Sequence, residues 1–269
     1  MTVFLDELLA STRDRVASER AAEPLADIRA RVDQRTTTPR SLRDALAAPG
    51  VQVIAEIKRA SPSMGDLAID LDAGALARAY ATGGAAAISV LTEPERFKGT
   101  LDDLRAAAAA GPPVLRKDFV VDEYQVWQAA DAGASAVLLI VAALSQDELA
   151  NLHAVAEVAG LDTLIEVHDE AELDLARSVA PTIVGVNARD LRTFELDRDA
   201  FARLRPSIPD NVVAVAESGI RGPEDVVAAA ADGADAVLVG ESLVTSATPI
   251  QAVAALVAAG RPRRVKGAA

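Results

Sequence analysis

Short apolar runs rich in β-forming residues alternate with longer, alanine-rich segments of helical character from residue 51 to residue 260. The apolar runs occupy residues 51–58, 87–91, 113–117, 136–141, 162–167, 182–187, 212–216 and 236–239. Dividing these 210 residues by the eight runs leaves about 26 residues for each unit, the size of one strand, one helix and two short loops. The pattern therefore predicts eight consecutive strand and helix units.

Three of these units share a signature at the passage from helix to strand. It reads GGAAAI at 83–88, AGASAV at 132–137 and DGADAV at 232–237, where a glycine can end the helix and a small residue can begin the strand. Eight such units most simply close into a single (β/α)8 TIM barrel, whose active site lies at the carboxyl ends of the strands. A doubly wound open sheet is the alternative, but no G-x-G-x-x-G motif follows the first strand. We expect one α/β barrel domain over residues 1–269.

Residues 1–48 carry apolar positions at helical spacing. Leu5, Leu8 and Leu9 recur in this way, as do a leucine, an isoleucine and a valine between positions 25 and 32. Ser41, three residues before Asp44, resembles a capping box at the start of another short helix. We expect an N-terminal helical extension that covers part of the barrel.

Charge and composition exclude several classes of protein. A formal net charge of -13 argues against binding to nucleic acid or to anionic membranes, which needs clustered lysine and arginine. The absence of cysteine excludes disulfides, thiolate metal sites and a cysteine nucleophile. The longest apolar stretch, residues 136–144, has nine residues, whereas a membrane-spanning helix needs about twenty. Asp6 and Glu7 interrupt the N-terminal apolar residues, so we expect no secretory signal and a soluble, cytoplasmic protein.

Charged residues stand at the end of the first predicted strand, on the side that carries the core. Glu56 and Lys58 are two residues apart and share a face with Ile54. Charges on an apolar face need partners, and these two are each other's nearest candidates, so a purely structural ion pair is one interpretation. The loop that follows, SPSMG from Ser61 to Gly65, adds hydroxyl groups and favours a ligand site.

The third strand places Lys117 at the end of an apolar run. Strand alternation puts Leu115, Lys117 and Phe119 on one face, and Arg116 and Asp118 on the other. The face that ends in Lys117 could form the lip of a site, whereas the alternative is an ordinary ion pair with a nearby carboxylate.

The fifth strand places Glu166 on one face with Leu164. Burial can raise the pKa of such a carboxylate, so that it serves as a general acid or base. We interpret His168, one step further out, as a loop or capping histidine, and His153 as a residue on a helix surface.

The last three strands end in small and polar residues. Asn187 offers an amide that can both donate and accept a hydrogen bond, although a turn asparagine has the same sequence signature. The motif SGIRG follows the seventh strand and GES ends the eighth. Small residues at these strand ends let backbone N–H groups approach an anion, which predicts a phosphate-bearing substrate.

Lysines, glutamates, an asparagine and a serine thus stand at different strand ends. In this set the chain resembles the indole-3-glycerol phosphate synthase family, whose fold is a (β/α)8 barrel. The motifs that carry the resemblance are IAEIKRASPSMG, SVLTEPERFKG, VLRKDFVVDEYQV, LIEVHDEAEL, VGVNARDLRTF, VAESGI and LVGESL. The N-terminal FLDELL also resembles the extension found in that family.

The resemblance implies a carboxy-lyase of tryptophan biosynthesis. Such an enzyme converts 1-(2-carboxyphenylamino)-1-deoxyribulose 5-phosphate into indole-3-glycerol phosphate, releasing carbon dioxide and water, and needs no metal or organic cofactor. Lys117 would be the acid that protonates the developing oxyanion, and Glu166 the base. Glu56 and Lys58 would surround the substrate carboxylate and the departing hydroxyl.

The resemblance also implies residues that bind the substrate. Asn187 and Ser218 would hold hydroxyl groups of the ribulose chain. Leu91, Phe97 and Phe119 would form an apolar slot for the anthranilate ring. The other expected substrate-binding residues, most of them around the phosphate, are Ser61, Arg189, Gly219, Gly240, Glu241 and Ser242.

Two positions depart from the family pattern. Many members have a second asparagine where this chain has Ala188, so any ligand contact from that side chain is lost here. Some members have a serine directly after the glycine that corresponds to Gly240, whereas this chain has Glu241 and then Ser242. Because a carboxylate would repel phosphate, we expect the Glu241 side chain to turn away and its backbone to bind.

Two other functions stay open. Phosphoribosylanthranilate isomerase is a related barrel with a related ligand, but that family uses a cysteine at its first strand end and this chain has none. A non-catalytic barrel that binds a phosphate ligand would lack one of the ionisable residues, and all are present. We expect a monomer or a weak homo-oligomer that acts on a small phosphorylated molecule.

Overall fold

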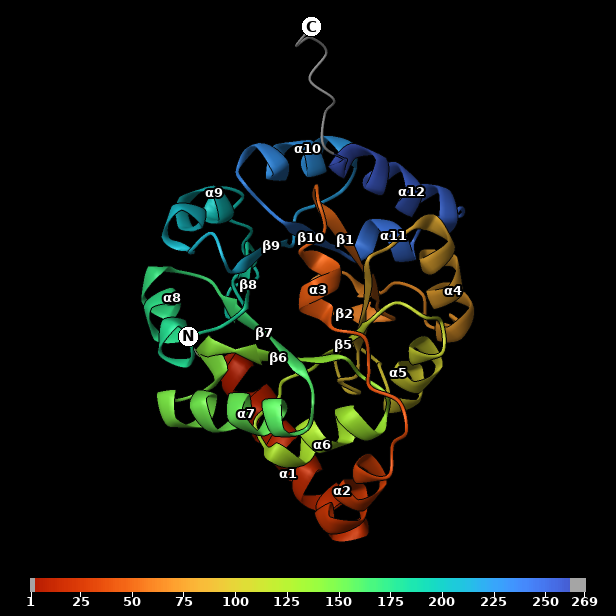
Figure 1. Ribbon diagram of the computed structural model, residues 1–269, viewed down its shortest axis with the longest axis vertical. Helices are drawn as coiled ribbons and strands as arrows, with labels where there is room; N and C mark the ends of the chain where they lie inside the picture. The colour runs from red at the N-terminus through yellow and green to blue at the C-terminus, as the bar shows by residue number, and fades with distance from the viewer. Residues whose placement is uncertain (1–2, 262–269) are drawn as a thin grey trace, which may run out of the picture.

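Eight parallel strands close into a barrel in the computed structural model, which describes residues 3–261. The strands lie in the order β1-β10-β9-β8-β7-β6-β5-β4 around the barrel (Figure 1). Their bounds are β1 (Gln52–Ile57), β4 (Ala87–Leu91), β5 (Val114–Lys117), β6 (Ala136–Ile140), β7 (Asp162–Val167), β8 (Ile183–Asn187), β9 (Val213–Glu217) and β10 (Ala236–Val239). A short antiparallel hairpin of β2 (Ala60–Ser61) and β3 (Gly65–Asp66) lies in the loop after β1.

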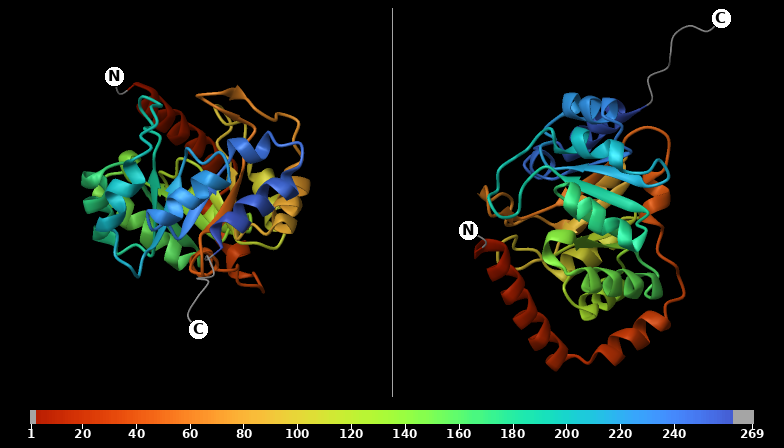
Figure 2. Two further views of the ribbon diagram at one scale, coloured as in Figure 1. Left: turned by 90° about the horizontal axis from the view of Figure 1, so that it is seen from above. Right: turned by 90° about the vertical axis from the view of Figure 1, so that its left-hand side faces the viewer.

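Helices surround this barrel, and each parallel strand is followed by a connection that returns outside it (Figures 1 and 2). The helices are α4 (Ala73–Gly83), α5 (Leu101–Ala108), α6 (Glu123–Asp131), α7 (Gln146–Val158), α8 (Glu170–Ala176), α9 (Ala200–Leu204), α10 (Pro223–Ala231), α11 (Glu241–Val244) and α12 (Pro249–Gly260). Short 3-10 turns lie at η1 (Val141–Ala143), η2 (Arg177–Val179) and η3 (Arg205–Ser207). This arrangement confirms the predicted (β/α)8 TIM barrel.

Local sequence explains where the helices begin and end. Five of the helices around the barrel start at a residue whose side-chain oxygen accepts a hydrogen bond from a backbone N–H of the first turn. These N-caps are Asp72, Thr100, Asp122, Ser145 and Asp169. The repeated helix-to-strand signature places Gly84, Gly133 and Gly233 at φ angles of 91°, 88° and 86°, a left-handed conformation that ends the helix at low cost only for glycine.

The predicted strands agree with the observed ones to within one residue at each end. The seventh strand is the important difference, because it continues through Glu217 and was expected to end at Ala216. The extra residue matters because successive side chains of a strand point to opposite faces. Glu217 therefore shares the face of Val215, whose side chain is buried.

The N-terminal extension consists of the predicted helices and packs on the outside of the barrel. Helices α1 (Val3–Ala22) and α2 (Leu25–Asp33) run along α6, and α3 (Leu42–Leu46) precedes β1 (Figure 2). Tyr124 on α6 donates its hydroxyl hydrogen to the backbone oxygens of Glu19 and Glu23 at 3.1 and 3.0 Å. Arg35 donates to the carbonyl groups that end α6 and α7. Ser41 caps α3 as expected, accepting from the backbone N–H of Asp44.

The last helix closes the barrel against the first strand. The backbone N–H of Val51 donates to the Gly260 oxygen at 2.7 Å, and α12 packs between α4 and α10. None of the helices within residues 3–261 combines the length and the apolar character needed to cross a membrane.

Candidate active site

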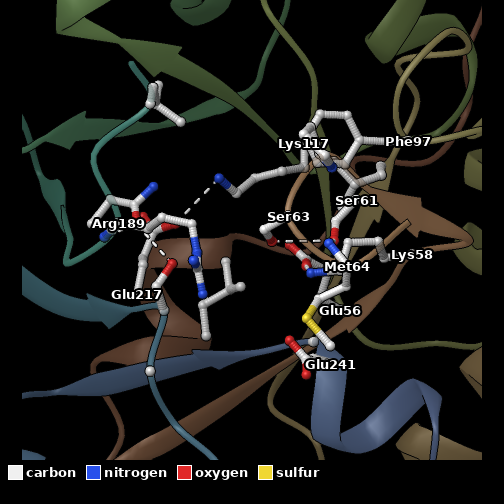
Figure 3. Close-up of a pocket in the computed structure, with 18 of the residues that line it drawn as sticks. Glu56, Lys58, Ser61, Ser63, Met64, Phe97, Lys117, Arg189, Glu217 and Glu241 are labelled. Carbon is white, nitrogen blue, oxygen red and sulfur yellow. Dashed lines mark hydrogen bonds and ion pairs between the residues drawn. The ribbon is translucent and has the colours of Figure 1, made fainter. Parts of the chain in front are cut away.

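A cavity of about 430 Å³ opens at the carboxyl ends of the barrel strands (Figure 3). Every residue that the sequence predicted for catalysis or substrate binding lines this one cavity. The residues are Glu56, Lys58, Ser61, Leu91, Phe97, Lys117, Phe119, Glu166, Asn187, Arg189, Ser218, Gly219, Gly240, Glu241 and Ser242. The barrel therefore brings together side chains that lie up to 186 residues apart in the sequence, from position 56 to position 242.

Lys117 extends from the end of β5 across the floor of the cavity to two carboxylates of β7 and β9. Its Nζ lies 2.7 Å from Oε2 of Glu166 and 3.3 Å from Oε2 of Glu217. Burial alone would lower the pKa of Lys117, but the charges of Glu166 and Glu56 and the hydrogen bond to Glu166 raise it above its ordinary value. The alternative of an ion pair is thus correct in its chemistry, yet the partners themselves belong to the cavity.

Glu166 is fully buried and is held through both of its carboxylate oxygens. Oε2 accepts from Lys117, and Oε1 accepts from Nδ2 of Asn187 at 3.2 Å. Burial favours a higher pKa, but Lys117, His168 and these hydrogen bonds outweigh it and lower the pKa of Glu166 to about 2. Burial does work to raise the pKa of this carboxylate, as expected, but the cation and the donors around it outweigh that effect.

Glu217, which the sequence analysis missed, has its pKa shifted in the opposite direction. It lies beside Asn187 in the strand register, and its side chain is almost fully buried. Its Oε1 packs against Gly185, where a methyl group would come within 2.0 Å of that oxygen. Burial and the neighbouring Glu166 raise the pKa of Glu217 to about 8, although Lys117 works in the other direction. Extending the seventh strand by one residue would have placed Glu217 on the inner face.

Glu56 and Lys58 form the predicted ion pair, with Nζ 3.1 Å from Oε1. Glu56 is buried, and the pair lies against the backbone of Gly240 at the end of β10. A methyl group on Gly240 would come within 2.4 Å of Oε1 of Glu56 and 3.2 Å of Nζ of Lys58. Only a glycine at position 240 leaves room for the two side chains, so the ion pair can lie against the end of the eighth strand.

Asn187 and Ser218 lie side by side at the ends of β8 and β9. The Ser218 hydroxyl donates to Oδ1 of Asn187 at 2.7 Å, and the Arg189 backbone N–H donates to the same oxygen at 3.0 Å. Asn187 is therefore both a turn residue and a cavity residue. Ser218 and Gly219 have φ angles of 66° and 78°, so the chain turns sharply and exposes its backbone to the cavity.

Several groups at the ends of β9 and β10 are suited to an anion. Gly219 and Gly240 line the cavity without a side chain, and the Ser242 hydroxyl is buried without a hydrogen-bond partner in the described part of the chain. Glu241 begins α11 and is exposed (Figure 3). Arg198 and Arg221 also line this end of the cavity, although sequence analysis did not single them out.

An apolar slot occupies the opposite side of the cavity. The rings of Phe97 and Phe119 lie 6.4 Å apart between centroids and are inclined by 43°. Leu91, on the strand next to Lys117, completes the slot. Phe119 also packs in the hydrophobic core, so its ring belongs both to the slot and to the core.

The two histidines have different surroundings. His153 lies on helix α7 as expected, but its side chain is 16% exposed and packs against β7, with Nδ1 2.9 Å from Oγ1 of Thr163. His168 follows β7 in a loop, as expected, and its ring lies beside Glu166. Neither histidine lines the cavity.

Solved structures share the fold of this chain. A thiamine phosphate pyrophosphorylase from Pyrococcus furiosus superposes with a TM-score of 0.61 at 14% identity, over 81% of this chain and 97% of its own. A mandelate oxidase mutant superposes with a TM-score of 0.59 at 19% identity, over 87% of this chain and 83% of its own. At such low identity these likenesses concern the fold alone.

Sequence comparisons are more specific. The curated indole-3-glycerol phosphate synthase of Mycolicibacterium gilvum (strain PYR-GCK) is 53% identical over 257 residues, which cover 95% of this chain and 94% of the relative. The protein of that name in Mycobacteroides abscessus is 51% identical over 257 residues, with coverage of 95% and 94%. A family model described as indole-3-glycerol phosphate synthase matches residues 5–256. The chain therefore belongs to the indole-3-glycerol phosphate synthase family.

Proposed function

We propose that the protein converts 1-(2-carboxyphenylamino)-1-deoxyribulose 5-phosphate into indole-3-glycerol phosphate, in tryptophan biosynthesis and without a cofactor. The observation that carries the proposal is the Lys117 ammonium, held between Glu166 and Glu217 beneath an apolar slot. A substrate with an aromatic ring in that slot and its phosphate near Gly219 and Gly240 has its carbonyl group between them, within reach of Lys117.

In the proposed first step, the ring carbon that bears the carboxylate attacks the ribulose carbonyl. A carbon–carbon bond forms, and the carbonyl electron pair takes a proton from Nζ of Lys117. Protonated Glu217 leaves Lys117 with one ionised partner at neutral pH, so the ammonium is held less tightly than by two carboxylates. After Lys117 has given its proton to the substrate, Glu217 can donate its own proton to Lys117 across the 3.3 Å that separate the two groups.

In the proposed later steps, carbon dioxide leaves and its bonding electrons restore the aromatic ring. Loss of water then requires an acid for the departing hydroxyl and a base for a proton of the ring system. In the proposal, Glu56 and Lys58 surround the substrate carboxylate and the departing hydroxyl, and Glu166 is the base that removes the proton. Glu166 suits this role because its lowered pKa keeps it ionised at neutral pH.

The hydroxyl and phosphate groups of the substrate have separate partners in the proposal. Asn187 and Ser218 hold the ribulose hydroxyls, and Arg189 supports the turn that carries them by donating to the Phe194 oxygen. Ser61, Gly219, Gly240 and the backbone of Glu241 and Ser242 bind the phosphate. The unpartnered Ser242 hydroxyl supports this placement, because an anion would supply the missing acceptor.

A cytoplasmic location and a monomeric or weakly associating state complete the proposal. The cysteine-free sequence and the net charge of -13 are consistent with a metabolic enzyme that binds neither nucleic acid nor anionic membranes. Light scattering on the purified chain over a range of concentrations measures the state of association. A stable higher oligomer at all concentrations would contradict this part.

The activity is tested with the purified full-length protein and the carboxyphenylamino-deoxyribulose phosphate in the presence of a metal chelator, with indole fluorescence as the readout. We expect product to form at a rate proportional to enzyme concentration. No product would contradict the synthase function. Product that forms only after metal is added would contradict the cofactor-free mechanism and leave the synthase function intact.

A further inference from the structure

His168 lies directly behind the carboxylate that we assign as the base. Its side chain is 12% exposed and comes from the residue after β7, two positions beyond Glu166. Nε2 lies 3.7 Å from Oε1 of Glu166, the oxygen that does not contact Lys117. Because His168 does not line the cavity, it reaches the substrate site only through Glu166.

Glu172 holds the other side of the ring. Its Oε2 lies 2.9 Å from Nδ1 of His168 and accepts from the His168 backbone N–H at 2.8 Å. The Glu172 backbone is itself anchored, since its N–H donates to Oδ1 of the N-cap Asp169 at 2.9 Å. The start of α8 therefore fixes the orientation of the imidazole.

This geometry determines the protonation state of the ring. Nδ1 faces a carboxylate oxygen that already accepts a hydrogen bond, so Nδ1 carries a hydrogen. In a neutral imidazole Nε2 would then present a lone pair to the Glu166 carboxylate, and two acceptors would face each other in a buried site. Nε2 is buried and makes no hydrogen bond within residues 3–261, so nothing else there supplies a donor. An imidazolium donates from Nδ1 to Glu172 and places its positive charge 3.7 Å from Glu166.

The charges around His168 are acidic on every packed element. Glu166 comes from β7, Glu172 from α8 and Glu217 from β9, and Asp190 in the loop after β8 also interacts with the ring. Burial works to lower the pKa of His168, but the hydrogen bond to Glu172 and the charges of Glu166 and Glu172 raise it above its ordinary value. Lys117 is the neighbouring cation, on the far side of Glu166.

We propose that His168 is a positioning residue whose imidazolium, anchored by Glu172, orients Glu166 and keeps it ionised while Lys117 gives up its proton. The inference rests on the proposed function, which requires Lys117 to lose its charge during ring closure. At that moment a buried Glu166 would lose the cation at 2.7 Å and would tend to take a proton itself. The second cation, 3.7 Å away, remains in place and opposes that protonation.

The first test observes the ring without relying on activity. The chain contains two histidines, so ¹⁵N NMR of the imidazoles in the full-length protein gives two sets of signals, and His153→Gln assigns them. We expect His168 to remain doubly protonated above pH ~6.5, the ordinary histidine pKa. In Glu172→Gln the amide can still accept from both N–H groups but carries no charge, so the proton is lost at lower pH. A neutral His168 ring at pH ~6.5 or below in the wild type would overturn the proposal.

The second test uses kinetics and a matched pair of variants. His168→Gln should lower kcat about tenfold, the factor that corresponds to one pKa unit, with KM nearly unchanged. Glu172→Gln should move the alkaline decline of kcat to lower pH. The controls are His153→Gln and Glu157→Gln, since these residues form the other histidine and glutamate pair at i and i+4, away from the cavity.

The outcomes separate this inference from the proposed function. An unchanged kcat in His168→Gln, or an equal loss in His153→Gln, would overturn the role of His168 while the synthase function stands. A wild-type protein that forms no product overturns the function, whereas the NMR titration still reports the state of the ring. If His168→Gln does not fold, the Glu172→Gln variant tests the proposal. A shift of the alkaline decline of kcat to lower pH supports the role of His168, and an unchanged decline overturns it.

Discussion

Lys117 and its two carboxylate partners divide their protons unequally. The Glu166 carboxylate accepts from Lys117 and Asn187 and is ionised, whereas Glu217 has one oxygen against Gly185 without a donor and retains its proton at neutral pH. The pKa values of two carboxylates at similar burial therefore move in opposite directions because their neighbours and hydrogen-bond partners differ.

Replacement of Lys117 tests the acid at the residue scale. Lys117→Met should fold, because Glu166 can take up a proton when the ammonium is absent and the pKa of Glu217 is already raised. Turnover should fall by at least about 100-fold, the typical effect of removing a general acid. Fluorescence assays of product, with circular dichroism as the control for folding, measure both. Turnover within a few-fold of wild type would return Lys117 to a structural role.

The raised pKa of Glu217 predicts that the free energy of unfolding depends on pH. Its folded pKa of about 8 exceeds the ordinary value of 4.5, so the folded state binds the extra proton between these values. The free energy of unfolding should therefore fall as pH rises from about 5 to about 8, with a slope of up to about 1.4 kcal/mol per pH unit. Glu217→Gln cannot lose this proton and should show a shallower slope in urea unfolding.

An exposed acidic residue provides the control for this slope. Glu224 lies in the first turn of α10, at the surface. Glu224→Gln should keep the wild-type dependence on pH. Equal slopes in the Glu217 and Glu224 variants would show that Glu217 is already ionised at neutral pH.

The sequence indicated Lys117, Glu56 and Lys58 because charges on an apolar strand face stand out. It did not single out Glu217, because the apolar run was ended one residue early. His168 was interpreted only as a loop or capping residue, since its contact with Glu166 depends on how the ring is turned by Glu172. Side-chain orientation of this kind is set by tertiary contacts.

At the scale of elements, β5 uses its two faces for different purposes. The inner face carries Lys117, whereas the outer face carries Arg116 and Asp118, both fully buried as an ion pair at 2.8 Å. The pair is extended by the Thr92 hydroxyl, which donates to Asp118, and by Arg15 of α1 at 3.3 Å. Ion pairs and a hydrogen bond on the outer face thus hold the strand that presents Lys117.

Replacement of Arg116 tests the contribution of this buried ion pair to stability. Arg116→Met leaves Asp118 buried with reduced compensation and should lower the free energy of unfolding by about 3 kcal/mol or more. Arg105→Met is the control, because Arg105 pairs with Asp102 at the surface and should contribute less than about 1 kcal/mol. Urea unfolding of both variants measures the difference. Equal losses would show that burial of the Arg116 pair adds no stability.

The N-terminal extension shows what helical spacing can and cannot predict. Its apolar positions predicted helices, and α1, α2 and α3 are present. Spacing does not identify the surface on which these helices pack. That surface is formed by α6 and by the C-terminal end of α7. Docking depends on polar contacts from residues about 100 positions away, such as Arg31 with Asp131.

At the scale of the whole molecule, the barrel closes where the end of the chain meets its beginning. Gly83 on α4 lies against α12, and a methyl group there would come within 2.7 Å of Cβ of Val253 and 2.8 Å of the Ile250 oxygen. Gly260 approaches Val51 even more closely. Close approach of these helices needs glycine at the contact points.

Two alanine substitutions within α4 test this closure. Gly83→Ala should destabilise the protein by about 1–3 kcal/mol, because overpacking forces the helices apart. Gly74→Ala in the same helix meets its nearest neighbour at 3.3 Å and should be neutral or stabilising, since alanine is the better helix former. Thermal unfolding of both variants measures the contrast. A stabilising Gly83→Ala would mean that α12 can shift without cost.

The expectation of one domain over residues 1–269 stays a prediction, and residues 1–2 and 262–269 lie outside the described part. Domain unity predicts a single cooperative unfolding transition.

The sequence by itself determined the barrel, its strands to within one residue at each end, and many of the residues that meet in the cavity, although not Glu217. It could do so because apolar periodicity and strand alternation are local, and because parallel strands of a closed barrel present their carboxyl ends together. Only the tertiary structure decided which carboxylate is ionised, which residues support it and where the extension docks. These properties depend on burial and on charges contributed by elements distant in sequence, so a pKa such as that of Glu217 follows from its neighbours in space.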